Sequence, residues 1–299
     1  MQLRHEISRF PVRAALTLAL AAVFSQPLFA VKLVGTDING GHLVYLVPSK
    51  PAITMFTTGA KPDGVVVGPY QQIIYVLSTT GQVHSFDPYA ITDTTLATGL
   101  TTPVDLVVEP GCKSILVSDI GVNKIFRIVL ASHVVTTLYN GPDKIEGITY
   151  DSVGNLFAND DQLNAVVQID PTTGLILNQT SAGSPLTALN DLTYDSFTKA
   201  LFATSSTGQV LYQVTTDLAT VTTLTFTGGP LLAGIVSDGG GNLYVVGGDG
   251  TTSKLYRYTI SSGTLTIVNT VPGLEDIAPL PPGPCIKAGG GGEEACDGI

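Results

Sequence analysis

The sequence predicts an all-β fold, a ring of six repeated units of four antiparallel strands each. Three observations predict it. The chain is rich in Thr and Val, which favour strands, and only 13 % of its 299 residues are charged. A pair of short apolar runs recurs six times. The two ends of the repeated region each hold an incomplete unit, and the two parts complement each other. This pattern is typical of a six-bladed β-propeller.

The most regular element of the repeat is a short strand that follows a turn. Its copies are 40 to 45 residues apart and begin at His42, Gln82, Lys124, Ala165, Gln209 and Lys254. Another strand precedes each copy, as in "KLVGTD", "SILVSD" and "NLYVVG". Turn residues bound both runs, and β-branched and aromatic residues fill them, as expected for strands. A period of this length fits one propeller blade.

Two further strands complete each unit. Upstream of the pair lies an apolar segment such as "GVVVG" at Gly64 or "GITYD" at Gly147. Downstream lies a Thr-rich run such as "VVTTLY" at Val134, which we expect to be the outer strand of the blade. Each unit therefore has four strands, the number found in a propeller blade.

The ends of the repeat predict how the ring closes. The N-terminal unit lacks a first strand, and "DIAPL" (276–280) is a first strand with no unit after it. One blade built from both ends would close the ring and leave no exposed sheet edges. The alternative is an open solenoid, which needs capping units. We find no such units in the sequence.

The region before the first repeat is typical of a signal peptide. Arg4, Arg9 and Arg13 precede or flank an apolar run (14–24), and "SQPLFA" offers a small-residue cleavage site after Ala30. An uncleaved membrane anchor is the alternative, but the run is shorter than a typical span. We expect a signal peptide (1–30), the propeller (31–280) and a flexible Gly/Pro-rich tail (281–299). The predicted location is extracellular or periplasmic, without stable membrane insertion.

The three cysteines bear on the tail. Cys285 and Cys296 flank its Gly-rich stretch, and in an oxidising compartment they could close a small disulfide loop. Cys112 lies in an apparent turn, "EPGCKS", and would then be an unpaired thiol.

The charge limits the partners. The formal net charge is −10 although the predicted signal segment carries three arginines. Nucleic acids and anionic membranes attract basic surfaces, so the charge argues against both. A cation, a sugar or a neutral protein surface fits better, and we expect a monomer.

Short polar residues recur between the second and third strands of several units. Asp37 is followed by Asn39, Asp119 by Asn123, and Asp160 by Asn164. Such side chains accept hydrogen bonds from turn backbone and tolerate positive φ, so we interpret them as turn-forming residues. A calcium loop is the alternative, but the glycine and distal glutamate of an EF-hand are absent.

A second polar column precedes the first strand of each unit. Its members are Asp63-Gly64, Val104-Asp105, Glu146-Gly147, Asn190-Asp191, Ala233-Gly234 and Glu275-Asp276. Because first strands line the channel of a propeller, the column predicts a ring of side chains at one channel mouth. Carboxylates that converge in this way repel one another, which raises their pKa values unless cations or backbone donors compensate.

The segments "DSVGNLFANDDQLNAVVQIDPTTG" and "SILVSDIGVNKIFRI" resemble NHL-repeat propellers and the six-bladed SMP-30/gluconolactonase-like family, over residues 31–280. Members of the latter hold a metal with Glu, Asn and Asp residues before a glycine. The resemblance implies Asp63, Glu146 and Asn190 as ligands of Ca²⁺ or another divalent cation, and Glu275 is added on position alone. The chain departs from this pattern, since Asn190 precedes Asp191 and no full "PNG" segment is present.

Three functions follow from this interpretation. The favoured one is a secreted propeller that binds a small ligand or a protein partner at the channel mouth, without chemistry. The alternative is a calcium-dependent lactonase or ester hydrolase, in which the metal polarises the carbonyl and Asp191 activates water. The third is a structural cell-surface or matrix protein whose Thr-rich outer strands form the contact.

Other catalytic signals are scarce. The sequence has no G-x-S-x-G, H-E-x-x-H, phosphate-loop or C-x-x-C motif. His84 lies in a column of otherwise apolar residues, so we expect a packed or hydrogen-bonded imidazole. Tyr70 and Tyr89 could stack on a sugar, but we interpret them as packing or turn residues.

Overall fold

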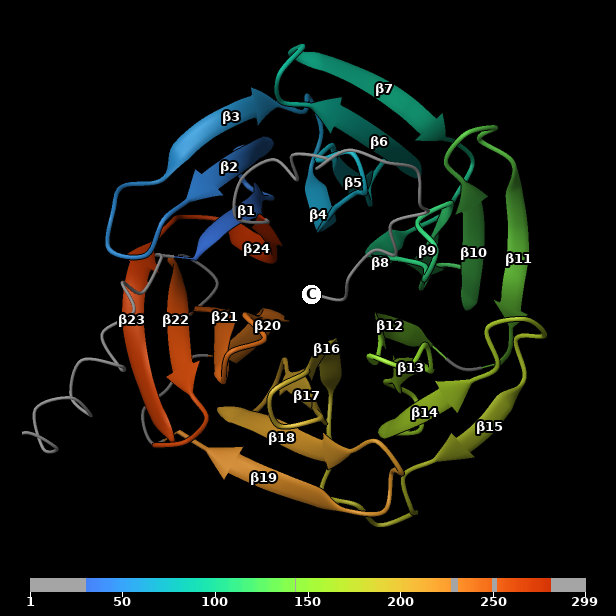
Figure 1. Ribbon diagram of the computed structural model, residues 1–299, viewed down its shortest axis with the longest axis vertical. Helices are drawn as coiled ribbons and strands as arrows, with labels where there is room; N and C mark the ends of the chain where they lie inside the picture. The colour runs from blue at the N-terminus through green and yellow to red at the C-terminus, as the bar shows by residue number, and fades with distance from the viewer. Residues whose placement is uncertain (1–30, 143, 227–230, 249–251, 281–299) are drawn as a thin grey trace, which may run out of the picture. The chain divides into compact units, whose positions relative to one another are not determined.

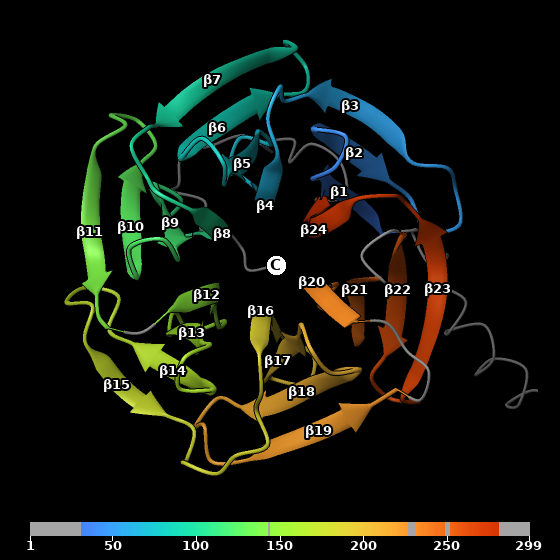
Figure 2. The same ribbon diagram turned by 180° about the vertical axis from the view of Figure 1, so that it is seen from behind.

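The computed structural model describes residues 31–280 apart from 143, 227–230 and 249–251. Six four-stranded antiparallel sheets stand around a central channel (Figure 1), which confirms the six-bladed β-propeller. The fourth strand of each blade lies at the rim in both face views (Figure 2). Among the described residues there is no helix, and so none long and apolar enough to cross a membrane.

The blades follow one another in chain order, and each runs from the channel outward. Blade 1 contains β24 (Leu274–Leu280), β1 (Lys32–Asp37), β2 (His42–Leu46) and β3 (Ile53–Thr57); blade 2 contains β4 (Pro62–Val67), β5 (Ile73–Leu77), β6 (Gln82–Asp87) and β7 (Thr92–Ala97); blade 3 contains β8 (Pro103–Val108), β9 (Ser114–Asp119), β10 (Lys124–Val129) and β11 (Val135–Asn140); blade 4 contains β12 (Ile145–Tyr150), β13 (Leu156–Asp160), β14 (Ala165–Ile169) and β15 (Ile176–Gln179); blade 5 contains β16 (Leu189–Asp195), β17 (Ala200–Ser205), β18 (Val210–Thr215) and β19 (Val221–Thr225); blade 6 contains β20 (Leu231–Ser237), β21 (Asn242–Gly248), β22 (Ser253–Thr259) and β23 (Thr264–Thr270).

Blade 1 closes the ring as predicted. Its innermost strand is the C-terminal β24, which pairs antiparallel with β1 so that Val34 lies opposite Ala278. In Figure 1 the red and blue ends of the colour scale therefore meet within one sheet. The pairing supplies β1 with the neighbour that its own unit lacks, so β1 is not an edge strand.

The core lies between the blades. Each hydrophobic cluster joins two neighbouring sheets; for example, Leu116 of blade 3 packs with Ile148 and Leu156 of blade 4. The second strand of a blade is covered on both faces, and β5 is buried at every position. The outer strands are exposed, as in β15. This gradient explains why second strands are continuous apolar runs while fourth strands are rich in Thr.

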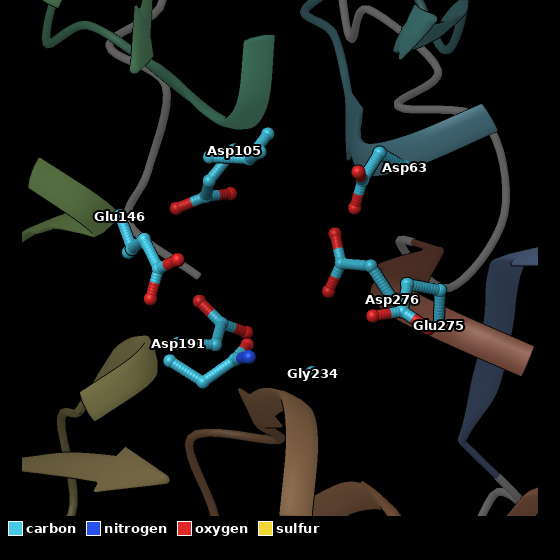
Figure 3. A pocket seen from close by; sticks show the side chains of 10 residues that line it. Asp63, Asp105, Glu146, Asp191, Gly234, Glu275 and Asp276 are labelled. Carbon is cyan, nitrogen blue, oxygen red and sulfur yellow. The ribbon is translucent and has the colours of Figure 1, made fainter. Parts of the chain in front are cut away.

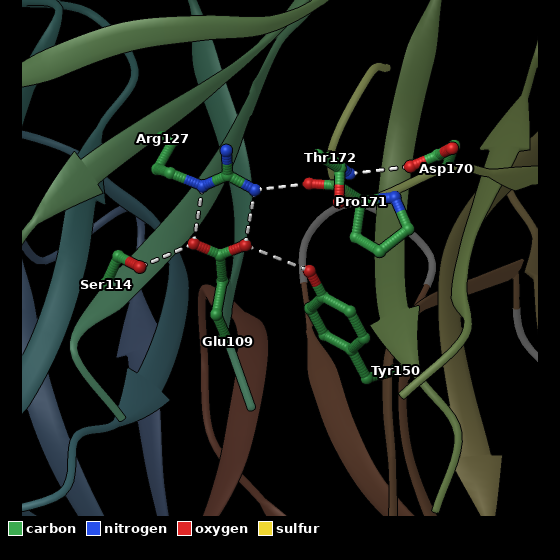
Figure 4. A network of polar contacts seen from close by, with 7 residues as sticks. All are labelled: Glu109, Ser114, Arg127, Tyr150, Asp170, Pro171 and Thr172. Carbon is green, nitrogen blue, oxygen red and sulfur yellow. Dashed lines mark hydrogen bonds and ion pairs between the residues drawn. The ribbon is translucent and has the colours of Figure 1, made fainter. Parts of the chain in front are cut away.

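A polar network also joins blades 3 and 4 (Figure 4). Arg127 makes a two-pronged ion pair with Glu109, with 2.7 Å from Nε to Oε2 and 2.7 Å from Nη2 to Oε1. The same carboxylate accepts hydrogen bonds from Ser114 and from Tyr150 of the next blade. Burial alone would raise the pKa of Glu109, but these donors outweigh it and hold the pKa below its usual value.

The recurring Asp and Asn residues form turns, as predicted. Asp37 accepts hydrogen bonds from the backbone N–H groups of Asn39 and Gly40. Asn123 and Asn164 adopt positive φ values of 55° and 50°. The bonds of Asp37 are those of an Asx-type turn, in which the side chain replaces a backbone partner, and the positive φ values are the left-handed conformation that Asn tolerates in turns.

His84 is a half-buried, hydrogen-bonded histidine, as expected. Its Nδ1 lies 2.7 Å from Asp93 Oδ2, and its ring stacks on Tyr75, whose hydroxyl donates to the other oxygen of Asp93. The imidazole is therefore part of the packing inside blade 2.

The structure corrects the prediction for Cys112. This residue is disulfide-bonded rather than an unpaired thiol. The other two cysteines of the chain, Cys285 and Cys296, lie outside the described residues, as does the predicted bond between them.

Candidate functional site

The polar column lies at a β-bulge that recurs in every blade. The pairing of each innermost strand with the second strand shifts register near its start, for example between Ile145 and Ile148 and between Leu189 and Leu192. The same shift occurs in the other four sheets. A bulge bends a strand and redirects its side chains. It therefore presents the column to the channel.

These residues surround a cavity of about 180 Å³ at the channel mouth (Figure 3). Its lining consists of Asp63, Val104, Asp105, Glu146, Gly147, Asn190, Asp191, Gly234, Glu275 and Asp276. The structure thus brings together all five residues that the sequence singled out for a site. It also adds the carboxylates of Asp105 and Asp276, which the sequence placed in the column without a role. Carboxylates from five of the six blades face this space.

The second position of the column alternates around the ring. Blades 1, 3 and 5 carry an aspartate there, and blades 2, 4 and 6 carry a glycine; in blade order the residues are Asp276, Gly64, Asp105, Gly147, Asp191 and Gly234. The site therefore has approximate threefold symmetry within a six-bladed ring. Each two-blade unit contributes one aspartate and one glycine.

Each aspartate bridges to the following blade. Asp105 Oδ1 accepts the N–H of Leu106 at 2.6 Å, and its Oδ2 accepts the N–H of Ile148 in blade 4 at 2.7 Å. Asp191 makes the same pair of bonds, and Asp276 accepts the N–H of Val65 in blade 2. These aspartates thus connect neighbouring blades through hydrogen bonds, and they also belong to the carboxylates that line the cavity.

The glycines make room for the next aspartate. A Cβ atom on Gly147 would lie 2.6 Å from the backbone nitrogen of Leu192 and 2.7 Å from Asp191 Cα. On Gly64 it would lie 2.4 Å from the carbonyl oxygen of Val104. Real Cβ contacts are not this short, so any larger residue would push neighbouring blades apart.

Hydroxyl groups on the second strands follow the same alternation. Thr36 and Thr204 each accept the N–H of their blade's aspartate and donate at 2.6 Å to a carbonyl of the following blade. Ser118 accepts the N–H of Asp105. Without the hydroxyls, the bulged backbone would leave these N–H and C=O groups without hydrogen-bond partners, which is costly for buried groups.

Asn159 breaks this alternation. It occupies the position of Thr36 in blade 4, where blades 2 and 6 carry Val76 and Val246. Asn159 is fully buried, and neither its Nδ2 nor its Oδ1 has a hydrogen-bond partner in the part of the chain that the structure describes. A buried amide without partners costs about 1–3 kcal/mol.

We therefore expect Asn159→Val to stabilise the propeller by about 1–3 kcal/mol, because it removes this penalty and matches the buried Val76 of blade 2. Thermal unfolding should show a melting temperature that is higher by a few °C. The converse substitution, Val76→Asn, is the matched control and should lower it. A lower melting temperature for Asn159→Val would contradict the prediction.

Burial and mutual repulsion raise the pKa values of the carboxylates that line the cavity, which we call the ring acids. Burial, with Glu275 and Glu146 nearby, raises the pKa of Asp63 to about 7 despite a hydrogen bond from Ser78. Burial raises the pKa of Asp191 to about 7, although two backbone N–H groups favour its charged form. The pKa values of Asp105 and Asp276 are raised well above their usual range by burial and by the charge of Asp191.

The two glutamates follow the same trend. Burial raises the pKa of Glu275, and burial raises that of Glu146 although Lys144 opposes it. The ammonium of Lys144 lies 2.6 Å from Glu146 Oε1 and 3.1 Å from Asp161 Oδ2. The mouth thus holds carboxylates whose ionisation is unfavourable until positive charge comes near.

Metal ligation by Asp63, Glu146, Asn190 and Glu275 stays a prediction. Among the described residues no group of three His, Cys, Asp or Glu side chains is arranged closely enough to hold a metal ion. The role of Asp191 as a base also stays a prediction, and both of its oxygens already accept backbone hydrogen bonds.

Comparison with known proteins gives relatives in structure alone. No family model matches the chain, and no curated protein matches it. A crystal structure of a nidogen/laminin complex contains a chain that is 15 % identical, with a TM-score of 0.70 over 84 % of this chain and 98 % of that chain. A TM-score of this size shows that the two chains share a fold. The chain is a six-bladed β-propeller.

Two lyase structures resemble the propeller less closely. Virginiamycin B lyase from Staphylococcus aureus is 19 % identical, with a TM-score of 0.57 over 70 % of this chain and 69 % of that chain. A streptogramin B lyase is 16 % identical, with a TM-score of 0.57 over 82 % of this chain and 75 % of that chain. Identities this low show a shared fold and leave membership of the NHL or SMP-30-like families a prediction.

Proposed function

We propose that the propeller is a binding protein whose acidic channel mouth receives a cationic group, a Lys or Arg side chain of a partner protein, without chemistry. The observation that carries the proposal is the convergence of six carboxylates, from Asp63, Asp105, Glu146, Asp191, Glu275 and Asp276, on one cavity. Their pKa values are all raised. An ammonium or guanidinium group would relieve this repulsion, because opposite charge favours the ionised form.

The size of the cavity favours a side chain over a larger ligand. Its volume of about 180 Å³ lies below the range of about 300–1,000 Å³ that is common for pockets of drug-sized molecules. The proposal also agrees with the nidogen/laminin structure, in which a protein with this fold was crystallised in a complex. A partner that inserts one basic side chain would use the mouth as the centre of a larger contact surface.

The affinity should depend on pH. Asp63 and Asp191 have pKa values of about 7, so both are largely protonated at pH 6 and largely ionised at pH 8. A cation binds the ionised form, and its binding therefore releases protons. We expect the affinity to rise about tenfold between pH 6 and pH 8, with the largest change near pH 7.

Isothermal titration calorimetry with Nα-acetyl-arginine amide at low ionic strength tests the proposal. We expect binding at pH 8 that is weaker at pH 6 and at high salt. Asp63→Asn and Glu275→Gln should each lower the affinity about tenfold. The control variant Asp217→Asn changes the same charge in an exposed turn after β18 and should have no effect. The neutral analogue Nα-acetyl-citrulline amide tests whether charge is required. Equal binding of both compounds, or no binding of either, would refute the proposal.

A further inference from the structure

One carboxylate of the acidic mouth is already paired with a cation of the chain itself. Lys144 stands directly before β12, and its Nζ lies 2.6 Å from Glu146 Oε1 and 3.1 Å from Asp161 Oδ2. Glu146 lines the cavity, whereas Asp161 belongs to the turn between β13 and β14 and lies outside the lining. Among the residues that the structure describes, no other cation pairs with a carboxylate of the cavity. The ammonium of Lys144 thus occupies the Glu146 side of the mouth.

The backbone keeps Lys144 close to both partners while its side chain stays accessible. The N–H of Asp161 donates to the carbonyl oxygen of Lys144 at 3.0 Å, which joins the start of β12 to the turn after β13. The side chain of Lys144 is 35 % exposed, and that of Asp161 is 27 % exposed. The ammonium can therefore leave Glu146 without a change in the backbone, and Asp161 still offers it a carboxylate at the rim.

Blade 2 contains the same sequence pattern without the ion pair. The segments "KPDG" at Lys61 and "KIEG" at Lys144 each place a lysine two residues before the acid of the column. Ser78 follows β5 as Asp161 follows β13, and Ser78 hydrogen-bonds to the column acid Asp63. Lys61 is exposed, and in the described part of the chain it makes no ion pair. In these two blades, the lysine pairs with its column acid only where the turn supplies a second carboxylate.

The opposite side of the cavity holds the acids that lack such a cation. Asp63 and Glu275 belong to the neighbouring blades 2 and 1, and they lie across the cavity from Glu146 (Figure 3). Burial and the charge of Glu275 raise the pKa of Asp63, so the two carboxylates repel each other. A basic group that enters the cavity is therefore attracted to this side first.

We infer that Lys144 is a built-in competitor of the partner's basic side chain, which displaces it from Glu146 toward Asp161. The inference rests on the proposed function of the mouth. The cavity has a volume of about 180 Å³, so a guanidinium group between Asp63 and Glu275 would repel the nearby ammonium of Lys144. Once Lys144 has moved, Glu146 is free to pair with the incoming group as well. Lys144 thus sets how strongly a basic group must bind before it gains the whole ring.

Calorimetric titration of Lys144→Met with Nα-acetyl-arginine amide tests the competition. The variant should bind about five- to tenfold more tightly than the unmodified protein, because it frees Glu146 and removes a like charge. Lys61→Met is the matched control, since it removes the same charge from the corresponding position of blade 2, and it should change the affinity by about twofold at most. Equal gains for both variants, or no gain for Lys144→Met, would overturn the inference and leave the proposed function intact. Absence of binding to all three proteins would refute the proposed function and the competition with it.

Acetylation of lysines by an N-hydroxysuccinimide ester, followed by peptide mass spectrometry, tests the displacement directly. In the free protein Lys144 should react several times more slowly than Lys61, because two carboxylates hold its ammonium. Asp161→Ser, which introduces the residue that blade 2 carries at this position, should reduce the difference. Saturating Nα-acetyl-arginine amide should raise the rate at Lys144 and leave the rate at Lys61 unchanged. Equal rates in the free protein, or a rate at Lys144 that the compound does not raise, would contradict the displacement.

Discussion

The propeller should be more stable near pH 5 than at pH 8, and Asp63→Asn should remove a large part of the difference. The folded state raises the pKa of Asp63 from 3.8 to about 7, so between these values it binds more protons than the unfolded chain. The free energy of unfolding therefore falls as the pH rises through this window. For a partly enclosed side chain, ionised Asp63 costs about 2–4 kcal/mol at pH 8.

Melting temperatures of the unmodified protein and the variant between pH 4.5 and 8.5 measure this effect. Asp63→Asn should be the more stable protein at pH 8 and should show a shallower pH profile. Some slope should remain, because the pKa of Asp191 is also raised to about 7. Asp87→Asn alters a turn before blade 2's outer strand and should leave the slope intact. A stability that increases steadily from pH 5 to pH 8 would mean that the ring acids are not electrostatically strained.

Gly147→Ala should destabilise the propeller by about 3 kcal/mol or more, although it adds a single methyl group. The new Cβ would meet the backbone of blade 5, at Leu192 N and Asp191 Cα, and backbone cannot rotate away as a side chain can. To make room, blades 4 and 5 must separate. Separation would also strain the hydrogen bond from Ile148 N to Asp105 Oδ2, which joins blades 3 and 4.

Urea denaturation with Gly240→Ala as the control separates this contact from a general cost of losing glycine. At Gly240 the nearest atom to an added Cβ is Asp238 Oδ1 at 3.4 Å, an ordinary contact distance. Gly147→Ala should lower the urea concentration at the unfolding midpoint strongly, and Gly240→Ala should lower it little. Similar shifts for both would show that the blades pack less tightly at the mouth than the distances indicate.

The repeat was readable from the sequence because strands, turns and period are local features. The six blades and the turn role of Asp37 follow from residues that are close in the chain. The closure by β24 and β1 follows from the two incomplete units at the ends of the repeat, which complement each other. The position of the acidic column could be predicted as well, since it depends only on which strand is innermost.

The roles within the column could not be predicted in the same way. Asp63 stands at the first position of the column and Asp105 and Asp276 at the second, and only the structure shows that the latter two carboxylates bond to backbone of the following blade. That contact joins residues about one repeat or more apart and requires the geometry of the closed ring. The signal that could have found it is the alternation of Asp and Gly at the second position, read across all six units at once.

The alternation of Asp and Gly also limits how many blades this ring can have. Every aspartate has a glycine on each side, one that leaves it space and one whose blade donates a backbone N–H to it. Such an order closes on itself only when the number of units is even. Loss or gain of a single blade would place two aspartates or two glycines in neighbouring blades. Two aspartates would clash, and two glycines would leave a junction without the hydrogen bonds of an aspartate. A ring of this kind can therefore grow or shrink by pairs of blades, which makes the two-blade segment its natural unit of duplication.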